Sequence, residues 1–148
     1  MIPSLVEEYI DIAYKNAIMS VDSRASAIAV LHDLGISVES EFGEFYSKYR
    51  GGFIGPKPIS ELLKIISEGI PTIPNQTEYV RNRYNIPAQY LAITTDEGEG
   101  MYLYNKSDQA VYDLDIGYLD EFLNNKLPAR WSSFNEFLVW YFDSPEPD

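Results

Sequence analysis

The densest group of chemically competent side chains in this sequence is acidic. Asp96, Glu97 and Glu99 fall within four residues, and Asp113 and Asp115 follow a short apolar run. Such carboxylates could collect a hard cation such as Ca²⁺, but their spacing departs from the Asp-x-Asp-x-Asp-Gly loop and distal Glu of an EF-hand. Paired carboxylates for acid–base catalysis need a shared cleft, which nothing in the sequence supplies. A solvated acidic turn is the simpler interpretation.

The other residues that commonly carry catalysis are scarce. His32 is the one histidine and cysteine is absent, so a nucleophile–base pair or a zinc site cannot be assembled in the usual way. Gly98-Glu99-Gly100 does not suit a phosphate, because the carboxylate of Glu99 would repel it. We therefore predict no catalytic residue, no metal and no cofactor, and we expect that the protein is not an enzyme.

Tyrosine offers a different function, because it is enriched at protein interfaces, where it gives a large contact area with a polar tip. The chain has 12 tyrosines, and several lie beside the carboxylates. Packing against helices is one interpretation, and contact with a basic protein is the other. For the second we select ten candidate partner-binding residues, which are Asp96, Glu97, Glu99, Tyr102, Tyr104, Tyr112, Asp113, Asp115, Tyr118 and Asp120.

These residues must be positioned by strands. Residues 91–95, 101–104 and 110–114 are three short runs rich in β-branched and aromatic residues, separated by polar turns. The pattern predicts an antiparallel meander. We expect Gly98 and Gly100 to supply positive φ angles in the first turn.

Helices should flank this sheet. The first is expected to begin at Ser4 with a capping box to Glu7, and the second to run from Asp22 or Ser23 to Gly35. The third should begin near Ser40 and stop at Gly51-Gly52, with an apolar stripe of Phe42, Phe45, Tyr46 and Tyr49. Further helical segments are expected at 77–84, 118–123 and 133–142, the last with a capping box from Ser133 to Glu136.

Two segments have less regular patterns. Four prolines punctuate residues 53–75, and the apolar run 59–66 suits either a short helix or an edge strand. Residues 144–148 are polar with two prolines and are expected to form a flexible tail. We predict that Leu31, Phe45, Ile93, Leu103 and Leu138 lie in the core between helices and sheet. The whole chain, 1–148, is expected to be a single α+β domain with one antiparallel or mixed sheet.

Composition narrows the class of partner. The net charge is −12, and from Asp96 onward there are 12 acidic residues against 3 basic ones. Nucleic acid and anionic membranes are therefore disfavoured as partners, since both need clustered Lys and Arg. The acidity either keeps the protein soluble or attracts a basic protein. The absence of cysteine and of a basic leader at the first residues suits a cytoplasmic protein.

Several motifs together resemble those of a known superfamily. Leu34-Gly35-Ile36, then residues 38–46, then Tyr49-Arg50-Gly51-Gly52 resemble the N-terminal signature of the SUKH superfamily. Residues 93–113 resemble its central strands, and residues 131–138 resemble its closing helix. The resemblance covers about 23–142. Glu39 stands where the superfamily usually has Pro, and Arg50 where Asn is usual.

The resemblance implies a function that residue types alone do not. The SUKH superfamily contains many bacterial immunity proteins and a yeast cell-wall assembly regulator. It implies a cytoplasmic immunity protein, with a monomer favoured, that binds one cognate toxin domain, often a nuclease and basic, and blocks it stoichiometrically. The alternative is a regulatory or scaffolding module that binds proteins, and a small metal-dependent hydrolase is a third hypothesis.

Overall fold

The computed structural model describes residues 1–143, so the expected flexible tail at 144–148 lies outside the described residues. Six α-helices are found in the described part, namely α1 (Ser4–Ala13), α2 (Val21–Asp33), α3 (Glu41–Lys48), α4 (Ile73–Tyr84), α5 (Leu119–Leu123) and α6 (Phe134–Phe142). The strands are β1 (Tyr90–Ala92), β2 (Gly100–Asn105) and β3 (Val111–Asp115), with 3₁₀ turns η1 (Glu97–Glu99) and η2 (Ile116–Tyr118). Within residues 1–143, no helix combines the length and apolarity needed to cross a bilayer.

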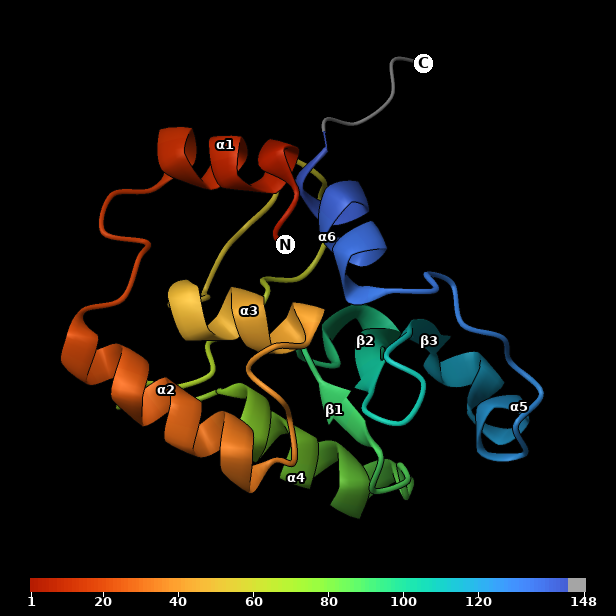
Figure 1. Cartoon of the computed structure of the whole chain (residues 1–148). Coiled ribbons are helices and arrows are strands. Elements are labelled where there is room, and N and C mark those ends of the chain that lie inside the picture. The colour runs from red at the N-terminus through yellow and green to blue at the C-terminus, as the bar shows by residue number, and fades with distance from the viewer. Residues whose placement is uncertain (144–148) are drawn as a thin grey trace.

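The three strands form the predicted meander. They pair antiparallel in the order β1-β2-β3, with Ala92 opposite Leu103 and Leu103 opposite Tyr112. Helices cover this one sheet (Figure 1), so the α+β prediction is confirmed. All strand pairs of this sheet in the described residues are antiparallel, so it is not the mixed sheet that the sequence also allowed.

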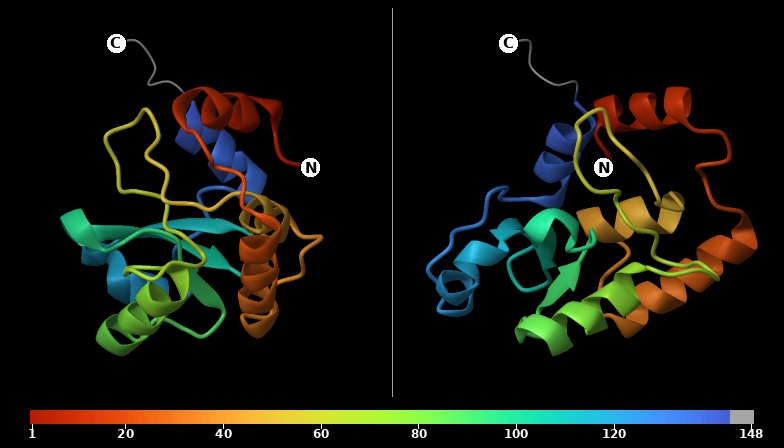
Figure 2. Two further views of the ribbon diagram at one scale, coloured as in Figure 1. Left: turned by 90° about the vertical axis from the view of Figure 1, so that its left-hand side faces the viewer. Right: turned by 180° about the vertical axis from the view of Figure 1, so that it is seen from behind.

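The strands send successive side chains to opposite faces, as pleating requires, and each face has its own core. Leu91 and Tyr104 join the larger hydrophobic cluster, while Tyr90 and Leu103 join the smaller one. The larger cluster is covered by α1, α2, α3 and α6, and the smaller by α4 and α5. Figure 2 shows this layering, with α1 and α6 on one side of the sheet and α4 and α5 on the other.

The aromatic stripe of α3 is the centre of the larger cluster. Phe42, Phe45, Tyr46 and Tyr49 are all buried, as predicted. Phe42 stacks on Tyr104 of β2 with ring centroids 4.4 Å apart. The five core residues predicted from the sequence are also buried, each with no exposed surface: Leu31, Phe45, Ile93, Leu103 and Leu138.

Helix ends follow local chemistry in most cases. Ser40 caps α3 by accepting a hydrogen bond from the Gly43 N–H, and Gly35 ends α2 with φ +78°. The predicted capping box at Ser4 is wrong, because Ser4 is already helical and Pro3 occupies the cap position. Ser20, two to three residues before the expected start, caps α2. Ser133 caps α6 as predicted, because its Oγ accepts a hydrogen bond from the Glu136 N–H. The second bond of the predicted capping box differs, since the Glu136 carboxylate accepts from the N–H and hydroxyl of Ser132 rather than from the N–H of Ser133.

The segment between α3 and α4 is neither the short helix nor the edge strand that its pattern allowed. It is held by isolated bridges, Phe53 to Leu62 and Lys64 to Thr72. Helix α4 begins four residues before the predicted Thr77, because Thr72 and Asn75 form a capping box. In the first hairpin, Gly98 and Glu99 have the positive φ angles, whereas Gly100 is extended and opens β2.

The edge of β1 is protected by neighbouring segments. Ala92 N–H donates to Thr77 Oγ1 of α4 at 2.9 Å, and Leu63 N–H donates to the Ile93 carbonyl at 2.9 Å. These bonds satisfy backbone groups that would otherwise face solvent. They also bring α4 and the segment around Leu63 beside the hairpin that carries the acidic residues.

Candidate partner-binding site

The ten candidate residues do not form one surface. Tyr102 and Tyr104 point to the face of the larger cluster, whereas Tyr112 packs with the smaller one. The turn between β1 and β2 carries Asp96, Glu97 and Glu99, and β3 ends at Asp115, opposite Gly100, so that Asp115, Tyr118 and Asp120 follow at the same end of the sheet as this turn. The alternation of side chains along a strand therefore separates residues that are close in sequence.

The acidic turn, residues 96–99, is partly tied down. The Tyr84 hydroxyl of α4 donates to Asp96 Oδ2 at 2.6 Å. Glu97 and Glu99 are exposed, and neither forms an ion pair within residues 1–143. Across the same residues, no group of three or more His, Asp or Glu side chains is arranged to hold a metal ion. The turn thus exposes two carboxylates that are unpaired within the described residues, and it supplies no coordination set for Ca²⁺ there.

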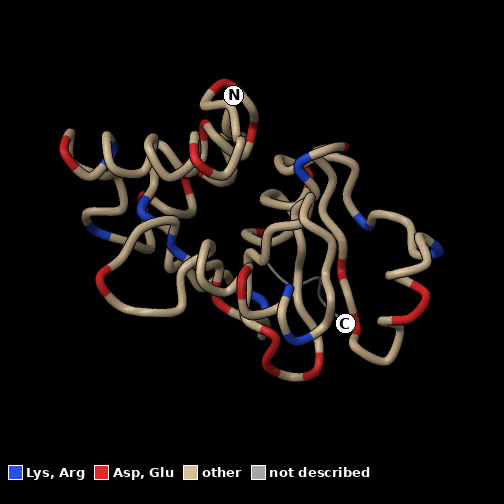
Figure 3. The backbone as a smooth tube through the Cα atoms, turned by 90° about the horizontal axis from the view of Figure 1, so that it is seen from below, with Lys and Arg blue, Asp and Glu red and all other residues tan. Residues whose placement is uncertain are grey.

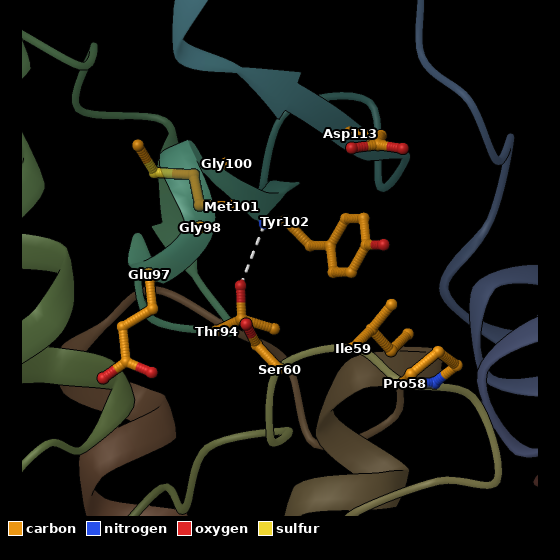
Figure 4. A pocket seen from close by; sticks show the side chains of 10 residues that line it. All are labelled: Pro58, Ile59, Ser60, Thr94, Glu97, Gly98, Gly100, Met101, Tyr102 and Asp113. Carbon is orange, nitrogen blue, oxygen red and sulfur yellow. Dashed lines mark hydrogen bonds between the residues drawn. The ribbon is translucent and has the colours of Figure 1, made fainter.

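Beside the acidic turn lies an open cavity of about 520 Å³, which we call the Tyr102 groove. It is lined by Pro58, Ile59, Ser60, Thr94, Glu97, Gly98, Gly100, Met101, Tyr102 and Asp113. Figure 4 shows the Tyr102 ring extending across the groove toward Ile59 and Pro58, with Asp113 on the same side. Glu97 lies on the other side of the hairpin, with its carboxylate directed away from the ring. Tyr102 N–H donates to Thr94 Oγ1 at 3.0 Å, which fixes the main chain beneath the ring.

The Tyr102 ring is held by three other aromatic rings. Its centroid lies 5.6 Å from those of Trp131 and Phe137 and 5.9 Å from that of Trp140. Burial, with a smaller contribution from the Asp113 carboxylate, raises the pKa of Tyr102 to about 12. The hydroxyl therefore stays protonated near neutral pH and can donate a hydrogen bond to a ligand.

A cation lies next to this aromatic group. The Arg130 guanidinium is 4.5 Å from the Trp131 ring centroid and 4.6 Å from that of Trp140, and it forms an ion pair with Asp113. Such stacking is a favourable cation–π arrangement. Asp113 is therefore neutralised by a neighbour, unlike Glu97 and Glu99.

One candidate tyrosine, Tyr104, is inaccessible in this fold, and another, Tyr112, is half-buried. Tyr104 is only 1% exposed and stacks on Phe42, and burial raises its pKa to about 12. Tyr104 is therefore a core residue and not the surface contact that the sequence suggested. Tyr112 packs against Tyr90 and Phe122, and its hydroxyl donates to Asp108 Oδ2 at 2.6 Å. Packing was the alternative interpretation of these tyrosines, and it describes both.

The remaining candidates lie at the start of α5. Asp115 Oδ1 accepts the Gly117 N–H at 2.8 Å and thereby caps η2. Tyr118 is 56% exposed, and Asp120 is exposed in the first turn of α5. Because Asp115 lies opposite Gly100, which directly follows the acidic turn, this group begins at the same end of the sheet as that turn.

Sequence reasoning missed several residues that surround Tyr102. Trp131, Trp140 and Arg130 come from the segment that precedes α6 and from α6 itself, and Ser60 comes from the irregular segment after α3. Adjacent Arg130 and Trp131 are a weak local sign of cation–π stacking. Their position beside β2 depends on the bridge from Trp131 to Val111, which no local pattern specifies.

His32 remains isolated. Its side chain is 91% exposed near the end of α2, and its one polar neighbour in an ion pair is Asp33, at 4.0 Å. Acidic positions are spread around the molecule, as Figure 3 shows, and Lys and Arg are fewer. Within the described residues, His32 belongs to no group of side chains that could hold a metal ion.

Comparison with known proteins agrees with this architecture. The model of the SMI1 / KNR4 family (SUKH-1) matches residues 28–140. The match begins within α2 and ends within α6, so it includes the whole sheet and the Tyr102 groove. No curated protein sequence matches the chain.

Proposed function

Because the chain belongs to the SMI1 / KNR4 family (SUKH-1), we propose that it is an immunity protein. It binds a cognate bacterial toxin domain and neutralises it by stoichiometric contact, without catalysis. The observation that carries this proposal is the acidic turn, whose unpaired Glu97 and Glu99 lie beside the Tyr102 groove. The toxin is a basic domain, such as a nuclease, and the complex forms in the cytoplasm of the producing cell.

Charge complementarity supports a basic partner. A nuclease domain needs a positive surface to bind phosphates, and the net charge of this chain is −12. Opposite potentials raise the encounter rate and exclude partners of the wrong charge. Glu97 and Glu99 are exposed and unpaired within residues 1–143, so they offer their charge without breaking an internal ion pair.

The groove supports a specific anchor. Interface energy concentrates in a few preorganised aromatic and Arg residues. The Tyr102 ring is already held by Trp131, Phe137 and Trp140, so it loses little freedom when a partner contacts it. Its protonated hydroxyl, Ser60 and the carboxylate of Asp113 give polar contacts beside the apolar side chains of Pro58, Ile59 and Met101.

A co-purification from the native strain, with mass spectrometry of the captured proteins, identifies the partner. The toxin domain is then produced separately and its activity is titrated with the purified protein. We expect inhibition to be complete at one molecule of this protein per toxin domain. A partner that binds at that ratio and keeps full activity would instead favour the regulatory or scaffolding alternative.

A further inference from the structure

A second groove lies on the other side of the acidic turn. It has a volume of about 360 Å³ and is lined by Ile70, Pro71, Asn75, Gln76, Tyr79, Thr95, Asp96 and Glu97. We call it the Gln76 groove. Glu97 lines both this groove and the Tyr102 groove, so the acidic turn is the ridge between them.

Gln76 is the unusual residue of this groove. It lies in the first half of α4 and is only 7% exposed, yet its Nε2 has no hydrogen-bond partner within residues 1–143. Buried amide donors are nearly always paired, because leaving one unpaired costs free energy. Gln76 lines the groove, so this buried donor lies at the groove wall without an acceptor in the described part of the chain. An acceptor that arrives with a ligand recovers the missing bond.

The walls of the Gln76 groove carry large apolar side chains that are exposed to solvent. Ile70 is 82% exposed and Tyr79 is 45% exposed, and both line the groove. Exposed large apolar side chains around a concavity that contains a few polar groups are typical of a binding site. On the side facing the hairpin, the rim carries the carboxylates of Asp96 and Glu97.

We propose that the Gln76 groove is the apolar anchor site for a loop of the basic toxin domain. The loop places one aliphatic side chain between Ile70 and Tyr79 and offers a backbone carbonyl to the Gln76 amide. A Lys or Arg next to that side chain meets Asp96 and Glu97. This assignment rests on the proposed function and adds to it the chemistry of the segment that is recognised.

Charge selects this occupant over a second copy of the chain. Two chains of net charge −12 repel each other, and a second acidic surface would meet Asp96 and Glu97 unfavourably. A basic loop gains from the same rim. The groove is also continuous with the acidic turn, so a partner attracted by Glu97 and Glu99 is already in place to insert the loop.

Two defined peptides test the recognition chemistry. The isotope-labelled full chain is titrated, with NMR detection, with acetyl-Lys-Leu-Gly-Lys-amide and with acetyl-Glu-Leu-Gly-Glu-amide. We expect the Lys peptide to bind saturably and about tenfold more tightly, as about 1.4 kcal/mol of differential charge interaction implies, and to shift the side-chain NH₂ signals of Gln76. Absence of saturable binding, or shifts confined to the backbone amides of residues 96–99, overturns the proposal.

Substitutions separate recognition from folding. Ile70→Ala and Tyr79→Ala should each weaken the Lys peptide about threefold or more, while Ile12→Ala, at an equally exposed isoleucine of α1, should not change its affinity. Gln76→Leu should raise the melting temperature of the free protein, because a buried unpaired donor is removed. The same variant should weaken peptide binding. A variant that gains stability and binds as tightly as the native chain shows that the amide serves no ligand.

The toxin domain distinguishes this inference from the proposed function. If the toxin is inhibited one to one and Ile70→Ala and Tyr79→Ala leave its dissociation rate unchanged, the groove assignment is wrong and the immunity function stands. If the Gln76 groove binds the peptide as expected but no co-purified toxin is inhibited, the groove is a recognition site and the immunity function fails.

Discussion

The Tyr84 hydroxyl donates a 2.6 Å hydrogen bond to the Asp96 carboxylate and so joins the last turn of α4 to the acidic turn. Arg83 Nε donates to the Tyr84 oxygen at 3.0 Å and extends the link by one residue. Burial, and then the hydrogen bond to Asp96, raise the pKa of Tyr84. The two grooves therefore share a ridge whose position depends on α4.

Replacing this tyrosine should loosen the ridge. Tyr84→Phe removes a hydrogen bond to a charged group at a half-buried position, and we expect a loss of about 1 kcal/mol in the free energy of unfolding. Chemical denaturation measures the loss, and hydrogen exchange should speed up at residues 95–100. Tyr79→Phe is the matched control on the same helix, because no hydrogen bond of the Tyr79 hydroxyl is found within residues 1–143. Equal stability of the two variants would show that the bond to Asp96 contributes nothing.

Gly43 should resist replacement by alanine despite its helical position. Helix propensity alone predicts that Gly43→Ala stabilises the protein by about 1 kcal/mol. A Cβ there would lie 2.0 Å from the Ser37 carbonyl oxygen and 2.7 Å from Val38 Cα, both of which are backbone atoms. We expect a net loss of about 2 kcal/mol or more, since the loop before α3 must move.

Thermal or urea denaturation decides the sign of the Gly43→Ala effect. Gly69→Ala is the control, because the nearest atom to its Cβ would be the Ser67 Oγ at 3.9 Å. That control should change stability by less than about 0.5 kcal/mol. A more stable Gly43→Ala variant would mean that the loop at residues 37–38 yields easily.

Reversing the charge of the acidic turn should slow toxin association. Glu97→Lys with Glu99→Lys removes the attraction, and we expect the association rate to fall about tenfold or more at low salt. The difference should shrink near physiological ionic strength, where charges separated by more than about 8–10 Å are screened. Stopped-flow or biosensor kinetics across a salt series measures this dependence.

The control for this reversal keeps the net charge equal. Glu8→Lys with Asp11→Lys changes two exposed carboxylates on α1, on the opposite side of the molecule from α4 in Figure 1. It should slow association much less than the turn variant does. Identical rates for the two double variants would show that only total charge matters and that the acidic turn is a solubility feature.

We expect no enzymatic turnover. The one histidine is isolated at the surface, and residues 1–143 hold no cluster of metal-binding side chains. Purified protein should leave nucleotides, phosphodiesters and peptides unchanged with and without Mg²⁺, Zn²⁺ or Ca²⁺, as followed by chromatography. Reproducible turnover that disappears in Asp96→Ala or Glu99→Ala would overturn this expectation and support the hypothesis of a small metal-dependent hydrolase.

High pH should unfold the protein through its buried tyrosines. Burial raises the pKa values of Tyr102 and Tyr104 to about 12 and also raises that of Tyr141. The folded state therefore favours the neutral phenol, and its stability is complete below the unfolded pKa of about 10 and declines as pH rises toward 12. Absorbance at 295 nm should show a group of late-ionising tyrosines that titrate together with loss of circular dichroism. Tyr104→Phe should reduce the amplitude of that step, and a smooth titration before any unfolding would contradict the burial.

Local sequence chemistry predicted the elements that it determines by itself. The cap at Ser40, the stop at Gly35 and the stripe from Phe42 to Tyr49 involve residues within one or two helical turns, and all three are confirmed. The hairpin strands were also recognisable, although their ends moved by one to three residues. The start of α4 was missed because Thr72 caps it with Asn75 rather than with Glu or Gln, and because Pro74 was interpreted as a breaker although it lies in the first turn.

The surroundings of the candidate site depend on contacts between distant segments. Tyr102 and Asp113 do meet in one groove, but Tyr104 and Tyr112 point elsewhere, because a register that buries three strands on both faces leaves few side chains for the surface. Arg130 and Trp140 reach Tyr102 only through the path of the chain from α5 to α6. A pattern of residues within a short stretch of sequence cannot predict this path of the chain.

The division of the hydrophobic residues between the two faces of the sheet has a consequence for cooperativity. The larger cluster joins α1, α2, α3 and α6, whereas the smaller one holds α4 and α5 with far fewer buried residues. Opening of the smaller cluster exposes less apolar surface than global unfolding, so it should form a separate low-energy fluctuation. Helix α4 connects the two clusters, because Ile73 in its first turn belongs to the larger one and Val80 to the smaller one. The start of α4 beside the Gln76 groove is therefore anchored to the larger cluster, whereas the second half of α4 and α5 can fluctuate while the larger cluster keeps the fold intact.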